Sequence, residues 1–271
     1  MNALLNLISR LFDLLVSLLG GSAVGVMLVV SVLSAAWALK LFQAATPQVR
    51  LAGVRDRLLG HIYEMGMYQD HLSVVARIQG DLARTNLRYL SLTLPALVVL
   101  AIPMVLTVGQ LESRFSHRPL SPGESAVFSV RLQNEADLPG VVLVPTTGVV
   151  VTAGPVRDYA LATATWSLRV ENPGVHLLTV SSGDRTLGTR EILAAGRLPQ
   201  LGENSKAGWV HRVLNPGAPT MAGAAGLAEM TLRLPARETR YLGVELGWLT
   251  AFMIFSLLAG LFLKGPLKVS I

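Results

Sequence analysis

The hydrophobic and polar positions of this chain separate long apolar runs from a charged segment and from a region of short alternations. Leu14 to Leu39 and Tyr89 to Leu111 contain no charged residue, and each run exceeds the roughly 20 residues needed to cross a bilayer core. A third apolar run extends from Leu246 to Leu263. The pattern predicts three transmembrane α-helices, over residues 21–44, 89–111 and 242–264.

The segment between the first two apolar runs is charged but keeps an apolar face. Apolar residues recur at three- and four-residue steps from Leu51 to Met65, and the steps resume from Leu72 to Leu82 after a break at Gly66. This is the periodicity of two amphipathic helices whose apolar stripes face each other. We predict a helical hairpin over residues 45–88.

The N-terminal residues also show helical periodicity. Apolar side chains cover one face, and the polar side chains fall on the other: Asn2, Asn6, Ser9, Arg10, Asp13 and Ser17. The pattern predicts an amphipathic helix over residues 1–20 that lies in the membrane interface. The alternative is an uncleaved signal-anchor, which would be expected to have a more basic start.

Residues 112–241 have a different pattern, in which short alternations are separated by Pro, Gly, Ser and Thr. The alternations predict seven strands: Ala126–Leu132, Gly140–Val144, Val149–Thr152, Leu161–Val170, Val175–Val180, Thr186–Leu193 and Ala228–Leu234. Strands at this spacing favour an immunoglobulin-like β-sandwich, with Trp166 as a core anchor. The Gly-, Ala- and Pro-rich stretch from Pro199 to Gly226 is predicted to be a long irregular loop.

Composition and charge place these elements around a membrane. Hydrophobic residues make up 51% of the 271 residues and charged residues 15%, which is too apolar for an ordinary soluble protein. The net charge of +6 is concentrated beside the apolar runs: Lys40 to Arg88 has seven basic and four acidic residues, whereas residues 112–245 have thirteen and twelve. This distribution explains the basicity of the chain without a nucleic-acid partner.

The positive-inside rule then predicts the topology. It places the hairpin and the tail, residues 265–271, in the cytoplasm, and the N-terminus and the β-domain outside. We expect a multi-pass protein of the inner or plasma membrane, with the lipid bilayer as its first partner.

Candidate chemistry is sparse. The chain has no cysteine, which excludes disulfides and thiolate metal sites. Its five histidines are dispersed, and His176 is expected to pack or to form a hydrogen bond at a strand start. Nucleophile elbows, zinc-binding helices, phosphate loops and dinucleotide fingerprints are missing from the sequence. We therefore expect no enzymatic activity, no metal and no cofactor.

Two sets of residues are candidates for a site. The hydroxyl groups inside the predicted spans either bond their own helix backbone or line a weakly polar groove: Ser31, Ser34, Thr93, Thr107 and Ser256. The basic residues of the hairpin segment are candidate cytoplasmic contacts: Lys40, Arg50, Arg55, Arg57, Arg77, Arg84 and Arg88.

The order of these elements resembles the conserved core of the YidC/Alb/Oxa membrane insertases. The residues that carry the resemblance are Leu4 to Leu19, Gly20-Gly21, Val24 to Phe42, Thr46-Pro47-Gln48 with the hairpin to Arg84, Leu87 to Val108, and the last span followed by Lys264-Gly265-Pro266-Leu267. The last span resembles the closing helix of the three-span members, among them the insertase subunit of the endoplasmic reticulum membrane complex and its archaeal relatives. The β-domain takes the place of the further pair of spans in bacterial YidC.

The resemblance implies a protein that helps membrane segments to insert or assemble through a shallow groove beneath the hairpin. Bacterial insertases carry an arginine inside the first conserved span, whereas Val30 to Ala38 contains none, so the groove here would offer only hydroxyl dipoles. Nascent membrane proteins would then be the partners. The second hypothesis is a non-catalytic, membrane-anchored β-sandwich that binds an envelope partner, with the spans as scaffold.

Overall fold

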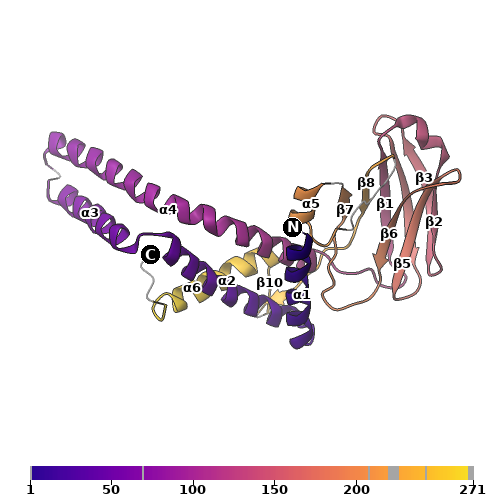
Figure 1. Ribbon diagram of the computed structural model, residues 1–271, viewed down its shortest axis with the longest axis horizontal. Helices are drawn as coiled ribbons and strands as arrows, with labels where there is room; N and C mark the ends of the chain where they lie inside the picture. Colours follow the sequence, from indigo (N-terminus) through magenta and orange to yellow (C-terminus); the bar gives the residue numbers. More distant parts are fainter. Residues whose placement is uncertain (1, 69, 207, 219–225, 242, 268–271) are drawn as a thin grey trace. The chain divides into compact units, whose positions relative to one another are not determined.

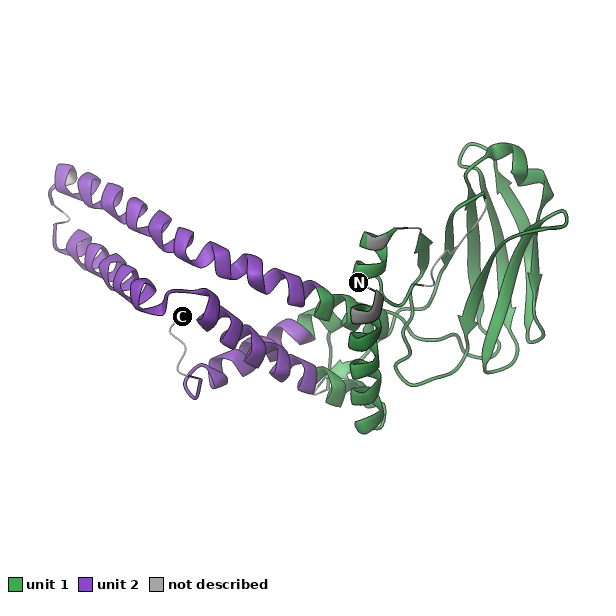
Figure 2. Ribbon diagram, viewed as in Figure 1, with its two compact units in different colours: residues 1–27, 106–251 green, residues 28–105, 252–271 purple. Residues whose placement is uncertain are grey.

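The computed structural model is a mixed helical and β-sheet protein, and it describes residues 2–68, 70–206, 208–218, 226–241 and 243–267 (Figure 1). The chain divides into two compact units (Figure 2). The first unit contains residues 1–27 and 106–251, and the second contains residues 28–105 and 252–271. Of the predicted tail, residues 268–271 lie outside the described part of the chain.

Each of the predicted apolar runs lies mostly in helices, and further helices lie outside these runs. The helices are α1 (Asn2–Leu18), α2 (Ala23–Ala45), α3 (Gln48–Met67), α4 (Leu72–Phe115), α5 (Trp209–Leu214) and α6 (Trp248–Leu263). By length and composition, α2 and the Ser73–Phe115 part of α4 could each cross a membrane, whereas α6 has 16 residues and is a shorter apolar helix. The structure thus contains two of the predicted long apolar helices, and the third is short.

The predicted hairpin is formed by α3 and the start of α4, both in the second unit (Figure 1). Leu51, Val54 and Ile78 of the two apolar stripes are buried, whereas Ile62 is exposed. The prediction divided the hairpin from the second span at Arg88, but α4 continues without a break to Phe115, through Pro95 and Pro103. The change from charged to apolar side chains near Arg88 alters the environment in which the helix is stable, but it does not alter the helical backbone. Such a change therefore does not mark the end of a helix.

The β-domain has a five-stranded and a three-stranded antiparallel sheet, and β9 (Arg240–Tyr241) pairs with β10 (Val244–Glu245) in a separate two-stranded sheet. The strands of the two larger sheets are β1 (Ser125–Leu132), β2 (Val141–Pro145), β3 (Val149–Asp158), β4 (Thr163–Val170), β5 (Val175–Ser182), β6 (Arg185–Leu193), β7 (Asn204–Lys206) and β8 (Leu227–Leu232). The five-stranded sheet has the order β3-β4-β1-β8-β7, and the three-stranded sheet has the order β2-β5-β6. Each of the seven predicted strands is present, although β3 is longer than predicted because it continues past Gly154 and Pro155.

One apolar core joins the two sheets in a β-sandwich-like arrangement. Alternate residues of β1 and β4 are buried, as the period of two requires. Phe128 and Trp166 pack in this core with their ring centroids 6.2 Å apart, and Leu178 and Ile192 come from the three-stranded sheet. The prediction that Trp166 is a core anchor is confirmed.

His176, at the start of β5, is buried and hydrogen-bonded as expected. Its Nδ1 lies 3.1 Å from the carbonyl oxygen of Thr147, and its Nε2 lies 2.8 Å from that of Asn172. The imidazole therefore ties two loops to the strand, which is a structural role.

The predicted loop from Pro199 to Gly226 is more ordered than its composition indicates. It contains β7, which pairs with β8 so that Ser205 lies opposite Met230, and it also contains the six-residue helix α5. Elements this short give too few positions for a periodicity to be visible in sequence. Residues 207 and 219–225 of the predicted loop lie outside the described part of the chain.

Candidate functional site

A groove of about 500 Å³ lies between α2, α4 and α6 in the second unit. Most of its wall is apolar. Its lining is Ser34, Ala35, Ala38, Leu39 and Phe42 of α2, Leu100 and Met104 of α4, and Met253, Ser256, Leu257, Gly260, Leu261 and Lys264 at α6 and just beyond it.

The sequence explains why a hollow forms at this place. The α2 residues of the lining follow helical steps of three and four, so they share one face, and the same is true of the α6 residues. Ala35, Ala38 and Gly260 are small on these faces, while the longer Leu100 and Met104 come from α4. Small side chains on two helices leave room that the third helix does not fill.

Two of the five candidate hydroxyl residues line this groove. Ser34 and Ser256 are part of its wall, and the Ser256 hydroxyl donates to the Met253 carbonyl oxygen at 3.2 Å. Thr93 donates to the carbonyl oxygens of Tyr89 and Leu90, at 3.2 and 3.0 Å, and is not among the lining residues. The groove therefore has weakly polar points in an apolar wall.

The other two candidates lie elsewhere. Ser31 is fully buried, and its hydroxyl has no hydrogen-bond partner among the described residues. Thr107 belongs to the first unit and does not line the groove. Both alternatives for the span hydroxyls therefore occur: Thr93 bonds its own helix, Ser34 contributes to the groove, and Ser256 does both.

Lys264 was missed as a groove residue by the sequence reasoning, which named it only in the family resemblance. It is exposed, and among the described residues that line the groove it alone is charged. The signal was its spacing, because Lys264 continues the helical steps of Ser256 and Gly260. The groove is consequently amphiphilic: most of its wall is apolar, and Lys264 contributes a positive charge.

The seven candidate basic residues from Lys40 to Arg88 are all exposed. Arg84 forms an ion pair with Asp81 at 3.1 Å, and Arg55 lies 3.7 Å from Asp56. Exposed pairs of this kind contribute little to stability. The cations of the hairpin therefore lie at the protein surface, and two of them take part in such ion pairs.

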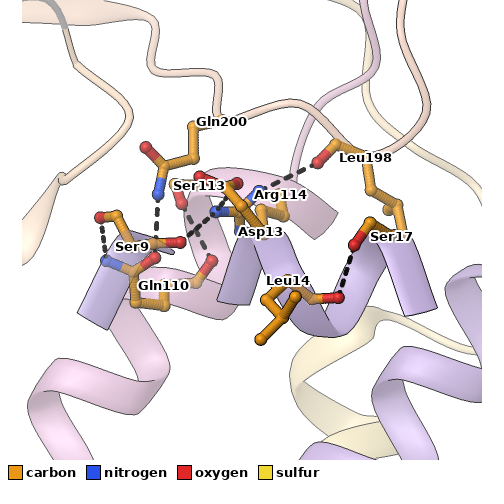
Figure 3. A network of polar contacts seen from close by, with 9 residues as sticks. All are labelled: Ser9, Asp13, Leu14, Ser17, Gln110, Ser113, Arg114, Leu198 and Gln200. Carbon is orange, nitrogen blue, oxygen red and sulfur yellow. Dashed lines mark hydrogen bonds and ion pairs between the residues drawn. The ribbon is translucent and has the colours of Figure 1, made fainter. Parts of the chain in front are cut away.

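A polar network in the first unit joins α1 to the end of α4 and to the loop after β6 (Figure 3). Arg114 lies at its centre with a side chain only 2% exposed. Its guanidinium donates to Asp13 at 2.7 Å, to the Leu198 carbonyl oxygen at 3.2 Å and to the Ser9 carbonyl oxygen at 3.4 Å. Gln110 donates to the Ser9 hydroxyl at 3.0 Å. Arg114 thus fixes α1 against the base of the β-domain.

The loop after β6 also holds the turn that follows α1. Arg197 donates to the Gly20 carbonyl oxygen at 3.0 Å. Gly21 has φ +74°, and a Cβ atom there would come within 2.7 Å of the Arg197 side chain. Only glycine fits both the left-handed conformation and this close approach.

Removal of the central arginine is expected to cost more than removal of its carboxylate. Arg114→Ala leaves a cavity and orphans the Leu198 carbonyl, which should lower the free energy of unfolding by about 3 kcal/mol. Asp13→Asn should cost about 1 kcal/mol, because the side chain of Asp13 is 62% exposed and asparagine still accepts a hydrogen bond. Thermal unfolding of the purified full chain in detergent measures both. Equal losses for the two variants would contradict this account of the network.

Comparisons with known proteins identify no relative of this chain: no protein-family model, no curated protein and no solved structure matches it. The function has to be argued from the groove, the hairpin and the β-domain.

Proposed function

We propose that this chain is a three-span membrane protein that assists the insertion or assembly of membrane segments, and that the groove between α2, α4 and α6 receives the segment. The observation that carries the proposal is the groove itself, with Ser34 and Ser256 in an otherwise apolar wall and Lys264 as its cation. The hairpin and the tail are cytoplasmic, and the N-terminus and the β-domain are extracytoplasmic.

The third span is supported by helical bonding beyond the ends of α6. Hydrogen bonds from the Ala251 amide to Gly247, from Lys264 to Gly260 and from Leu267 to Leu263 continue the spacing of four at both ends. At 1.5 Å per residue, the 16 residues of α6 rise about 24 Å, compared with about 30 Å for a typical hydrocarbon core. An upright α6 followed by the turn to Leu267 comes close to this thickness.

The chemistry of the groove fits a client segment that is mostly apolar but carries a polar group. In lipid, such a group lacks a hydrogen-bond partner, which is costly. Ser34 and Ser256 offer hydroxyls at this wall, and Lys264 attracts an acidic residue that flanks the segment. The groove offers this with one lysine and no intramembrane arginine, so it acts on weakly polar segments.

The exposed hairpin cations complete this proposal. Seven basic side chains lie on the segment that the charge rule assigns to the cytoplasm. Their partners are anionic: ribosomal RNA surfaces or the acidic flanks of a nascent chain, which exposed arginines bind through charge.

For the β-domain we propose an immunoglobulin-like topology. In the constant-type sandwich the two sheets have the orders A-B-E-D and C-F-G. Here β8-β1-β4-β3 and β2-β5-β6 follow the same two orders, with β8 in the position of strand A. Strand A is the first strand of an immunoglobulin domain, whereas β8, which takes its position here, comes late in the chain. β7 pairs with β8 and adds one more strand at that edge.

A second function has an observation of its own in this domain. The outer face of the three-stranded sheet exposes a group of apolar side chains on adjacent strands: Val142, Val144, Val175 and Leu177. Contiguous exposed apolar side chains are typical of protein interaction sites. The alternative proposal is that this face binds an envelope protein and that the spans only anchor it.

One cross-linking experiment tests both functions. Photo-reactive residues are placed at Ser34 in the groove, at Leu33 as the exposed neighbour on the same helix, and at Val144 on the sheet. Inverted membrane vesicles then receive a ribosome-stalled nascent chain with a single, weakly polar membrane segment. Capture at Ser34 several-fold above Leu33 is the expected result, since contact requires the groove.

The other outcomes are equally decisive. Equal capture at Ser34 and Leu33 means that the nascent segment meets the helices only through lipid, and the insertase proposal fails. Specific capture of one envelope protein at Val144, abolished by Leu177→Asp, would favour the alternative function.

A further inference from the structure

A second groove, of about 440 Å³, lies in the first unit beside α1. Its wall combines cations and neutral donors with a similar amount of apolar surface. The lining is Leu5, Asn6, Ser9 and Arg10 of α1, Gln200 of the loop after β6, Arg212 of α5, and Pro216 and Ala218. None of these lining residues is acidic.

The polar side chains of this groove suit a phosphate group. Arg10 and Arg212 come from helices that are far apart in sequence, and guanidinium groups match the geometry of phosphate oxygens. Asn6 and Gln200 add amide donors. The nearest acidic residue of α1, Asp13, is held by Arg114 at 2.7 Å, so it does not occupy the groove as an internal anion.

Part of the wall is held in place before any ligand arrives. The Ser9 hydroxyl accepts from Gln110 at 3.0 Å, and the Gln200 amide donates to the Gln110 side-chain oxygen at 2.9 Å (Figure 3). Gln110 therefore fixes two lining residues at once. Preorganisation of this kind lowers the entropy cost of binding.

The opposite face of α1 indicates the depth at which this groove lies. Leu7, Leu11, Leu14 and Leu18 recur at helical steps and are 57 to 74% exposed. The Gly20-Gly21 turn connects α1 directly to α2. If α2 crosses the bilayer, α1 must therefore lie in the interface with these leucines in the acyl region.

We propose that this groove binds the headgroup of an anionic phospholipid in the outer leaflet, with Arg10 and Arg212 on its phosphate oxygens. Asn6 and Gln200 donate to the remaining headgroup oxygens, and the acyl chains leave toward the leucine face of α1. The inference rests on the proposed membrane topology. It is independent of whether the groove between α2, α4 and α6 receives client segments.

The test measures lipid retention by the purified full chain. Native mass spectrometry in detergent follows the binding of added short-chain phosphatidylglycerol and, in a separate arm, phosphatidylcholine and free glycerol 3-phosphate. We expect preferential binding of phosphatidylglycerol, weakened at least about tenfold in Arg10→Gln and further in Arg10→Gln/Arg212→Gln. The matched control is Arg131→Gln/Arg169→Gln, which removes two exposed arginines of the sandwich and should leave binding unchanged.

The remaining variants and arms separate the possible failures. Arg10 is exposed, so its substitution alone should leave thermal unfolding unchanged even if the change at the half-buried Arg212 does not. Equal retention of phosphatidylglycerol by the wild type and by Arg10→Gln, or equal binding of the two lipids, overturns the proposal. Equal binding of free glycerol 3-phosphate overturns the assignment to a lipid. Cross-linking in the other groove is unaffected by these outcomes, so failure here is distinct from failure of the insertase proposal.

Discussion

Trp166→Ala is expected to unfold the β-domain at moderate temperature, because it removes the largest side chain of the described sandwich core. The side chain is 3% exposed and packs against Phe128 at a ring-centroid distance of 6.2 Å. Replacement of a buried aromatic residue by alanine lowers the free energy of unfolding by about 3–5 kcal/mol, from lost burial and from the cavity left behind. An isolated sandwich without disulfides has few other means of compensation.

The backbone opposite the indole makes relaxation of this cavity difficult. Gly154 of β3 lies so close to β4 that a Cβ atom there would be 2.8 Å from the Thr165 carbonyl oxygen and 3.2 Å from Trp166 Cδ1. The two strands are already in contact at this point and cannot approach further. The loss in the free energy of unfolding should therefore be near the upper end of the range of about 3–5 kcal/mol.

Circular dichroism in the strand region of the spectrum, recorded on the full chain in detergent during heating, measures this loss. The matched control is Arg169→Ala on the same strand, whose exposed side chain should change the free energy of unfolding by less than about 0.5 kcal/mol. If the Trp166→Ala variant unfolds at the same temperature as the control, the two sheets do not share the core described above.

The fold was predictable where one periodicity persists over many residues. The seven strands and α2 were found in this way, because burial of alternate residues in β4 or of one stripe in a helix leaves a repeating signal. Short elements were not found: β7 has three residues and pairs with β8, with Ser205 opposite Met230, and α5 has only six residues. Such contacts depend on partners distant in sequence.

The candidate site was predictable only in part, for a related reason. A helical pattern shows which residues share a face but not which face meets a neighbouring helix, so Ser34 and Thr93 looked equivalent in sequence. The structure separates them: Ser34 lines the groove and Thr93 bonds its own helix. Arg114 was not identified at all, because its burial requires Asp13, a residue 101 positions away.

Single cysteines at Arg57 and Arg169 are expected to react with a membrane-impermeant maleimide from opposite sides of the membrane. Arg57 lies in α3 of the hairpin and Arg169 in β4 of the sandwich, and both side chains are exposed, so labelling reports the side and not burial. The chain has no native cysteine, so each variant carries one reactive thiol without further changes. Intact cells should label only Arg169→Cys, and inverted vesicles only Arg57→Cys.

The physical reason for such a large difference is the cost of moving charge through lipid. Each of the seven basic residues from Lys40 to Arg88 would cost about 2.5–3.5 kcal/mol at the centre of a bilayer, so the short hairpin stays on the side where it is made. Permeabilised cells provide the control, because both thiols should then react. Labelling of both from the same side would mean that α4 does not cross the membrane, and the insertase proposal and the lipid site would lose their common basis.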